Sequence, residues 1–532
     1  MKTDRNAKTT NMQVPTPSNV RISVKDFGPI AKGSIDLRPL TIFVGPSNTG
    51  KTYFATLIYA LHLMLDGFQR LPVVFAYRDH FEPGFLRDET LATNIGLRKE
   101  ELQETLKKLE TVGRAFRFLD LPRGVRDAVR SVLKNPEVLG ACIGTEFERC
   151  FDLKSLSDLV RLSCESGGTQ LSLDVSEEKQ SLWHFDMELS ASGITTSGEI
   201  EDIILFPEEW LTSTLGHHRE FHRFSALVKE RMELDSSLER GHLFEFFDRL
   251  LYAANFANEQ DDMHYLPANR SGIMQSHRLI ASSLVARSTR TGQGHPREFP
   301  TLPGVTADFM EQLILFTEER ERDELIKTIA DTLEREVLDG QILINRASAG
   351  GYPEFVYQPR KTNEIIRLTR VSSMVSELAP VVLFLRAVIN RGDMLIIEEP
   401  EAHLHPAAQT EMAKTLGRLV RAGVRVVVTT HSDWLLKEIG NLVREGELKD
   451  KTGQPDRENL LPSSLQPSDV GVWQFRKDGT SKGATVEEIP YDRIEGVEPE
   501  EYEYVSEALY NRSADLQNQL AETAGGTKYK HE

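Results

Sequence analysis

The segment Val44–Thr52 reads VGPSNTGKT, which matches the pattern G-x-x-x-x-G-K-[ST] from Gly45 through Gly50, Lys51 and Thr52. Its glycines permit backbone conformations that a side chain would forbid. The loop can therefore turn its N–H groups toward phosphate oxygens, and the N-terminus of a following helix adds positive dipole. We expect Lys51 to reach the β- and γ-phosphates of a nucleotide and Thr52 to place its hydroxyl on Mg²⁺. The other residues expected around the phosphates are Pro46, Ser47, Asn48 and Thr49.

The residues on either side of this motif predict the strand and the helix that it requires. Residues 39–44, PLTIFV, form a short apolar run that favours a buried strand, and residues 53–65 have the apolar density of a buried helix. Residues 20–37 predict two more short strands around a Gly-Pro turn. This succession of elements indicates an α/β fold.

Two segments far along the chain place acidic and histidine side chains at strand ends. Glu398 and Glu399 follow the apolar run of DMLIIEEPEAHLHP (393–406), and His431 follows that of VRVVVTTHSDW (424–434). Helices between strands predict a parallel sheet, in which ligands bind at the carboxyl ends of strands. We therefore expect Glu398 to hold Mg²⁺ opposite Thr52, Glu399 to deprotonate the attacking water, and His431 to contact the γ-phosphate.

Composition narrows the protein class. The 532 residues carry a formal net charge of −18, which makes unspecific phosphate-backbone binding a poor default, although nucleic acid stays a possible partner. The three cysteines, an odd and low number, suit a reducing cytoplasm. The first 19 residues are polar and lack the apolar core of a secretory signal, and SELAPVVLFLRAVI is too short and too charged to span a membrane. We expect a cytoplasmic protein without a membrane partner.

The segments GPSNTGKT, LIIEEPEAHLHP and VVVTTHSD, in that order, resemble an ABC-type ATPase head of the SMC/RecF/Rad50 group. Within that group the chain looks most like the overcoming-lysogenization-defect (OLD) branch and the related ATPases of bacterial anti-phage systems, of the Septu, retron-associated or PARIS-like kind. The resemblance covers residues 20–65 and 340–480. It implies a P-loop NTPase head with a mixed or parallel sheet, interrupted by a helical and small antiparallel-β insertion, and it implies ATP and Mg²⁺ as cofactors.

The resemblance also implies a signature segment just before the carboxylate strand, in VSSMVSELAPVV (371–382). Ser372 or Ser373 would contact the γ-phosphate held by a partner subunit. Met374 and Val375 stand where family members often have glycine, so this segment departs from the family pattern.

Two further roles follow from the same resemblance. Glu401 and His403 fall in the segment that resembles the D-loop, at the dimer contact. Arg270 and Gln275, in PANRSGIMQS, are the candidates for the glutamine loop, and Gln275 would then be a ligand of the metal.

The family mechanism implies that two heads close around two ATP molecules and that hydrolysis releases them, so the product is a conformational signal. Residues 440–532 contain no D-x-D pair of the kind that the Toprim nuclease domain of OLD proteins needs. We therefore expect an ATP-dependent homodimer or larger homo-oligomer that controls a separately encoded effector, a nuclease in an anti-phage system.

Alternative functions remain open at this point. The chain could itself be an ATP-gated, metal-dependent nuclease, with ligands drawn from His217, His218 and His222 or from His403 and His405. It could also couple to a transporter, or act as a nucleotide-stabilised scaffold that hydrolyses slowly.

The expected domain organisation has six parts. They are a disordered tail (1–19), the P-loop half of the head (20–65), an insertion (66–260), a helical region that rejoins the head (261–340), the second half of the head (341–480) and a C-terminal helical tail (481–532).

Overall fold

A computed structural model describes the chain over 19–65, 67–68, 98–111, 114–133, 136–161, 168–177, 180–190, 193–212, 222–223, 225–226, 262–288, 301–317, 323–345, 353–453, 462–477, 483–497 and 499–523. Its strands are β1 Asn19–Phe27, β2 Ile30–Leu37, β3 Leu40–Val44, β4 Phe116–Arg117, β5 Gly168–Glu177, β6 Gln180–Ser190, β7 Gly193–Ile200, β8 Ile204–Phe206, β9 Met263–Leu266, β10 Gly340–Asn345, β11 Glu354–Pro359, β12 Ile366–Arg367, β13 Met394–Glu398, β14 Arg425–Thr429, β15 Val470–Lys477 and β16 Ala484–Ile489. Its helices are α1 Lys51–Leu65, α3 Lys99–Thr111, α4 Arg123–Leu133, α5 Pro136–Phe151, α6 Glu208–Thr212, α9 Arg270–Ser288, α10 Gly304–Ile314, α11 Glu324–Leu333, α12 Ser373–Ala387, α13 Pro406–Arg421, α14 Asp433–Thr452 and α15 Glu500–Thr523.

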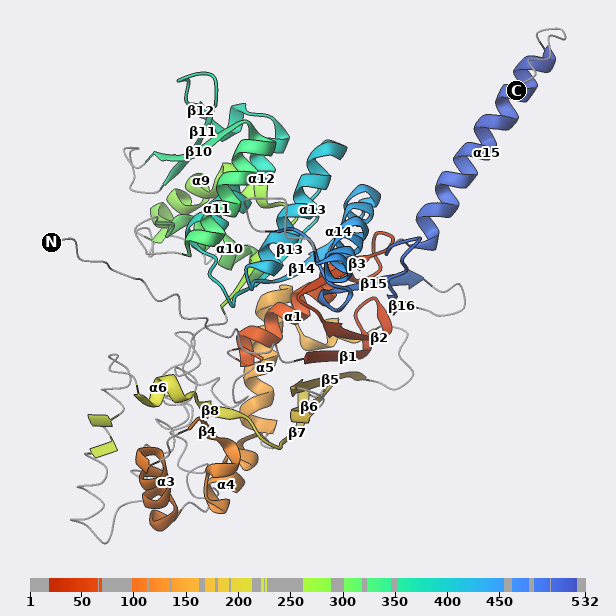
Figure 1. Ribbon diagram of the computed structural model, residues 1–532. Coiled ribbons are helices and arrows are strands. Elements are labelled where there is room, and N and C mark those ends of the chain that lie inside the picture. Colours follow the sequence, from red (N-terminus) through yellow and green to blue (C-terminus); the bar gives the residue numbers. More distant parts are fainter. Residues whose placement is uncertain are drawn as a thin grey trace.

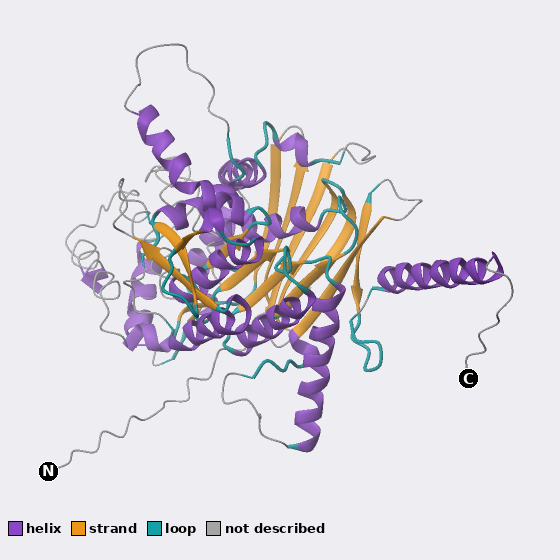
Figure 2. Ribbon diagram, turned by 90° about the horizontal axis from the view of Figure 1, so that it is seen from above, coloured by secondary structure: helices purple, strands orange, loops and turns teal. Residues whose placement is uncertain are grey.

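One mixed sheet organises the described part of the chain, with the strand order β7-β6-β5-β1-β2-β16-β15-β3-β14-β13-β9 (Figures 1 and 2). The strands β15, β3, β14, β13 and β9 are parallel neighbours, whereas β2, β1, β5, β6 and β7 pair antiparallel. The parallel strands β3 and β13 are buried along their whole length, as expected of strands covered on both faces. The α/β fold class with a mixed sheet is confirmed.

Two hydrophobic cores lie on the two faces of this sheet. Alternation along β3 separates them, since Leu40, Ile42 and Val44 pack into one core and Phe43 into the other. The Phe43 core is closed by α1 and α5, and the other core by α9 to α14 (Figure 1). The P-loop helix and the helices after the carboxylate strand therefore cover opposite faces.

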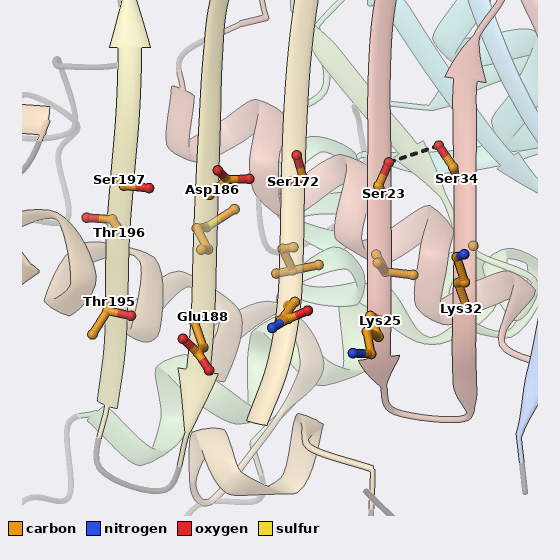
Figure 3. Close-up of a pocket in the computed structure, with 15 residues that line it drawn as sticks. Ser23, Lys25, Lys32, Ser34, Ser172, Asp186, Glu188, Thr195, Thr196 and Ser197 are labelled. Carbon is orange, nitrogen blue, oxygen red and sulfur yellow. Dashed lines mark hydrogen bonds between the residues drawn. The ribbon is translucent and has the colours of Figure 1, made fainter. Parts of the chain in front are cut away.

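Strands from the middle of the chain extend the same sheet. β5 pairs with β1 at the register Ile22↔Leu173 and with β6 on its other side, so these antiparallel strands continue the sheet of the head. Trp183 and Phe185 on β6 are buried together with Met187 and Leu189, because alternate residues of a strand share one face. The opposite face is polar and forms a shallow hollow lined by serine, threonine and charged side chains (Figure 3).

The glutamine-loop candidates lie in a helix. β9 ends at Leu266 and α9 begins at Arg270, so both Arg270 and Gln275 are helical residues. Further along, α10 and α11 are followed by a π-helical turn over Glu334–Leu338.

The C-terminal helix α15 leaves the body of the molecule (Figures 1 and 2). Several of its large apolar side chains are exposed, among them Val505, Leu509 and Leu516. Within the described residues, no helix has both the length and the apolar character to cross a bilayer.

Candidate functional site

The ends of three parallel strands bring the sequence motifs to one edge of the sheet. In the ladder, Phe43 on β3 lies beside Thr429 on β14, and Thr429 lies beside Glu398 on β13. The chain therefore leaves all three strands at the same level, into the P-loop, the carboxylate segment and the turn that carries His431. Lys51, Glu399 and His431 are far apart in sequence, and this pairing register is what brings the segments that carry them to the same end of the sheet.

The P-loop requires glycine at both of its motif positions. Gly45 has φ of +129°, and a Cβ there would lie 2.2 Å from the carbonyl oxygen of Phe475. Gly50 has φ of +103°, and its Cβ would lie 2.6 Å from a side-chain carbon of Ile30. Asn48 adopts φ of +60°, a conformation that asparagine tolerates better than most residues. The loop is thus held between β15 and β2 by neighbours that leave no room for side chains.

Lys51 lies buried beneath the loop that precedes it. Its Nζ donates to the carbonyl oxygens of Gly45 at 2.7 Å and Pro46 at 2.8 Å, and the Thr49 hydroxyl donates to Pro46 at 2.8 Å. Burial lowers the pKa of Lys51 to about 8, although Glu399 and Glu401 act in the opposite direction. The loop residues Pro46, Ser47 and Asn48 are exposed, as is Thr52 on the first turn of α1.

Glu398 is buried, and both of its carboxylate oxygens have donors within the chain. The Tyr265 hydroxyl donates to Oε1 at 2.8 Å, and the backbone N–H of Ala268 donates to Oε2 at 2.9 Å. Both donors come from β9 and the turn after it. Tyr265 was not among the predicted site residues; its one signal in the sequence is a polar aromatic side chain at the end of an apolar strand.

Glu399 turns the chain out of the sheet. Its φ of +43° lies in the left-handed region, and its N–H donates to the carbonyl and hydroxyl oxygens of Thr429 at 2.9 and 3.3 Å. Its carboxylate acts to raise the pKa of both Lys51 and His431. The side chain predicted to be the base is therefore close enough for its charge to act on both the lysine and the histidine.

Glu401, which the resemblance places at a dimer contact, lies beside the backbone of His431. Its Oε1 accepts from the backbone N–H of His431 at 2.7 Å, and its Oε2 is buried with no hydrogen-bond partner among the described residues. Burial raises the pKa of Glu401. The third carboxylate of the EEPE segment could have been suspected from its spacing, since it lies two residues after Glu399.

His431 follows β14, and the chain then enters α14, which Ser432 caps by accepting from the N–H of Leu435. Burial lowers the pKa of His431, Lys51 lowers it further, and Glu399 opposes both. A lowered pKa leaves the imidazole neutral near neutral pH, so one ring nitrogen can donate to a phosphate oxygen while the other remains an acceptor.

The glutamine-loop candidates lie behind the site. Arg270 is fully buried and donates to the carbonyl oxygens of Glu398 at 2.7 Å and Glu399 at 3.1 Å. Gln275, proposed from sequence as a metal ligand, donates to the Ser376 hydroxyl of α12 at 3.2 Å. This contact directs the Gln275 amide toward α12.

The residues of the expected signature segment begin α12. Ser372 caps this helix by accepting from the N–H of Val375 at 3.4 Å, and both Ser372 and Ser373 are exposed. Both serines therefore lie on the surface of the chain at the start of a helix.

The donor set fits Mg²⁺ and a nucleotide. Thr52 offers a hydroxyl and Glu398 a carboxylate, the hard oxygen ligands that Mg²⁺ prefers, often through its own water molecules. Each oxygen of Glu398 has one donor in the chain and can accept a second. Lys51 at the base of a glycine-built loop fits a polyphosphate.

The histidines of the alternative nuclease function were also located where the structure describes them. His217 and His218 are outside the described residues, and His222 is exposed. His403 Nε2 lies 4.0 Å from Glu377, and His405 caps α13 by accepting from the N–H of Ala407. Over the part of the chain that the structure describes, no group of three or more histidine, cysteine or acidic side chains is arranged to hold a metal.

Comparison with known protein families gives a match for the part of the chain that carries the carboxylates and His431. The model of the AAA ATPase domain family matches residues 308–436, a segment that contains Glu398, Glu399 and His431. No curated protein matches the chain. The similarity to this domain family supports an ATPase of AAA type.

Solved structures with a similar course include an SMC head bound to the C-winged helix domain of ScpA, at a TM-score of 0.39 and 9% identity over 90% of this chain and 99% of that one. The SMC head domain from Thermotoga maritima has a TM-score of 0.32 at 8% identity, covering 88% and 98% of the two chains. An Smc head domain from Pyrococcus furiosus, with an extended coiled coil and bound to ScpA, has a TM-score of 0.35 at 9% identity, covering 93% and 100%. These scores carry no inference about ligands or partners.

Proposed function

We propose that this protein is a Mg²⁺-dependent ATPase that dimerises around ATP and controls a separately encoded effector. The observation that carries the proposal is the register of β3, β14 and β13, which places the P-loop, Glu398–Glu399 and His431 at one sheet edge. The match of residues 308–436 to the AAA ATPase domain family supports the hydrolytic activity.

Each residue has a task in this proposal. The P-loop and Lys51 bind the phosphates, and Thr52 and Glu398 hold Mg²⁺, which neutralises charge on the β- and γ-phosphates when bound. Glu399 orients the attacking water and accepts its proton. His431 donates to the γ-phosphate and senses its departure.

Dimerisation completes the site in trans. Ser372 and Ser373, exposed at the start of α12, contact the nucleotide of the partner subunit, and the segment from Glu401 to His403 lies at the dimer contact. ATP favours the closed pair because only that state offers both sets of contacts, and hydrolysis reverses the preference.

The effector is a nuclease of an anti-phage defence system, in an arrangement like that of the OLD-related ATPases. The resemblance of EEPEAHLHP to that group supports this assignment. The activity of the ATPase is then a conformational signal to its effector.

The test measures phosphate release and nuclease activity of the purified full-length chain in Mg²⁺ and Mn²⁺. The proposal predicts ATP hydrolysis that Lys51→Ala abolishes, and no cleavage of DNA or RNA. Cleavage by the chain alone would establish the alternative of a nuclease in the same chain. Absence of hydrolysis with retained ATP binding would establish a nucleotide-stabilised scaffold.

A further inference from the structure

One short segment contacts both the side chain of Glu398 and the backbone of Glu398 and Glu399, the two residues of the carboxylate turn. This segment, the elbow, runs from Tyr265 at the end of β9 to Ser271 at the start of α9. β9 is the edge strand beside β13, paired in parallel with it, so the elbow leaves the sheet next to Glu398 and Glu399.

The first half of the elbow fixes the side chain of Glu398. The Tyr265 hydroxyl and the Ala268 N–H each donate to a different oxygen of the carboxylate, at 2.8 and 2.9 Å. Tyr265 is 2% exposed and Glu398 is 6% exposed. Two donors on two oxygens define the plane of a buried carboxylate, since rotation would leave a buried oxygen without a partner.

The second half fixes the backbone of the same turn. Arg270 has no exposed surface, and its guanidinium donates to the carbonyl oxygens of Glu398, Glu399 and Pro267. Glu399 adopts a left-handed conformation, which costs a non-glycine residue on the order of 1 kcal/mol. Arg270 therefore holds in place the turn that aims the Glu399 carboxylate.

The elbow is also joined to α12. Nε of Arg270 donates to the carbonyl oxygen of Glu377 at 3.2 Å and lies 3.4 Å from its carboxylate, and the Ser271 hydroxyl donates to the same carboxylate at 2.5 Å. Glu377 is buried one helical turn after Ser373. A displacement of α12 therefore acts on the guanidinium that holds the carbonyls of Glu398 and Glu399.

We propose that the elbow is a positioning element for the two carboxylates, in which Tyr265 orients Glu398 toward the metal, Arg270 orients Glu399 toward the water, and Glu377 couples both to α12. The inference rests on the proposed ATPase function and adds residues to it. Neither Tyr265 nor Arg270 contacts the nucleotide in this scheme; both act through the carboxylates.

The decisive variant is Tyr265→Phe, and Tyr59→Phe is its matched control. Tyr59 is 3% exposed and its ring lies 5.4 Å from that of Tyr265, but its hydroxyl donates to Asp308, outside the carboxylate turn. The first measurement is the Mg²⁺ concentration that half-saturates binding of ATPγS, with ATPγS binding in EDTA as reference. The second is kcat and KM for ATP, and the third is Tm.

For Tyr265→Phe we expect a several-fold higher Mg²⁺ requirement, unchanged binding in EDTA and a kcat lowered about tenfold, as for the loss of one hydrogen bond to a charged group. Tyr59→Phe is expected to change none of these three quantities. Glu377→Gln tests the coupling without removing Arg270, and we expect a lower kcat at unchanged Mg²⁺ requirement and KM.

The inference is overturned if Tyr265→Phe keeps the Mg²⁺ requirement and kcat of the wild type. It is equally overturned if both tyrosine variants lose activity in proportion to a lower Tm, because that result shows a merely structural role. Absence of turnover in the wild type would refute the proposed function instead, and the Mg²⁺ titration with ATPγS would still decide the role of Tyr265.

Discussion

The burial of Lys51 predicts that ATP binding takes up a proton above neutral pH. The pKa of Lys51 in the free chain is lowered to about 8, while bound phosphates stabilise the charged ammonium and raise that pKa. Binding then recharges the fraction of lysine that was neutral. From the free-state pKa, the expected uptake is roughly 0.1 proton at about pH 7, 0.5 at about pH 8 and 0.9 at about pH 9.

The sign of the affinity change follows from the same linkage. The protonated lysine binds phosphate, so affinity is full below about pH 8 and falls by up to about tenfold per pH unit above it. The phosphates of the nucleotide do not add to this pH dependence, since their last ionisation is complete above about pH 7.

Isothermal titration calorimetry of ATPγS in buffers with different ionisation enthalpies measures this uptake. Lys51→Arg is the matched control, because a guanidinium stays charged throughout this range. The expected result is uptake that rises with pH in the wild type and vanishes in the variant. Zero uptake at about pH 8, or the same uptake in both proteins, would refute the role of Lys51 as a buried, phosphate-binding lysine.

Three further predictions concern the loop, the core and the C-terminal helix. Gly45→Ala should abolish nucleotide binding while the chain stays folded, because its Cβ would lie 2.2 Å from the carbonyl oxygen of Phe475. Equilibrium binding measures the loss of affinity and circular dichroism measures the retained fold. Wild-type affinity for the nucleotide would contradict this prediction. Glu334→Ala should lower the free energy of unfolding in urea by about 3 kcal/mol, since it leaves the largely buried Arg386 without the carboxylate that its Nη2 contacts at 2.5 Å. A decrease below about 1 kcal/mol would show that this ion pair contributes little to stability. Truncation before Glu500 should leave Tm nearly unchanged, because α15 leaves the body with exposed apolar side chains; a large fall in Tm would show that α15 packs against the body.

The residues that could be predicted from sequence are those whose chemistry is unusual for their surroundings. Gly45 and Gly50 form part of a spaced motif, and Glu398 and Glu399 end a run of apolar residues, where a carboxylate needs a partner. The alternation in β5 and β6 was equally plain, because one face is buried and the other is polar. These signals are local, so a single sequence contains them.

The supporting residues could not be found in this way. Tyr265 and Arg270 contact Glu398 and Glu399 across about 130 positions of sequence, and although Arg270 was named as a glutamine-loop candidate, nothing in the local pattern predicts these contacts. Gln275 was assigned to the metal through the family resemblance, and that assignment stays a prediction. In the structure Gln275 lies on α9, which begins at Arg270, and its amide donates to α12.

Glu401 makes contacts that the resemblance did not describe. Its carboxylate accepts from the N–H of His431 and its charge acts on the pKa of Lys51, while its place at a dimer contact stays a prediction. The position of Glu401 depends on the left-handed turn at Glu399, and none of the residue types in this segment predicts such a turn.

The central claim is that Glu399 is the base of an ATPase that closes as a dimer on ATP. The most direct measurement is ATP turnover together with solution mass, for the wild type and Glu399→Gln, each with and without ATP and Mg²⁺. The account predicts turnover by the wild type alone and accumulation of the variant as an ATP-bound dimer or larger assembly. Equal turnover by both proteins would contradict it, because the proton of the attacking water would then go to another group.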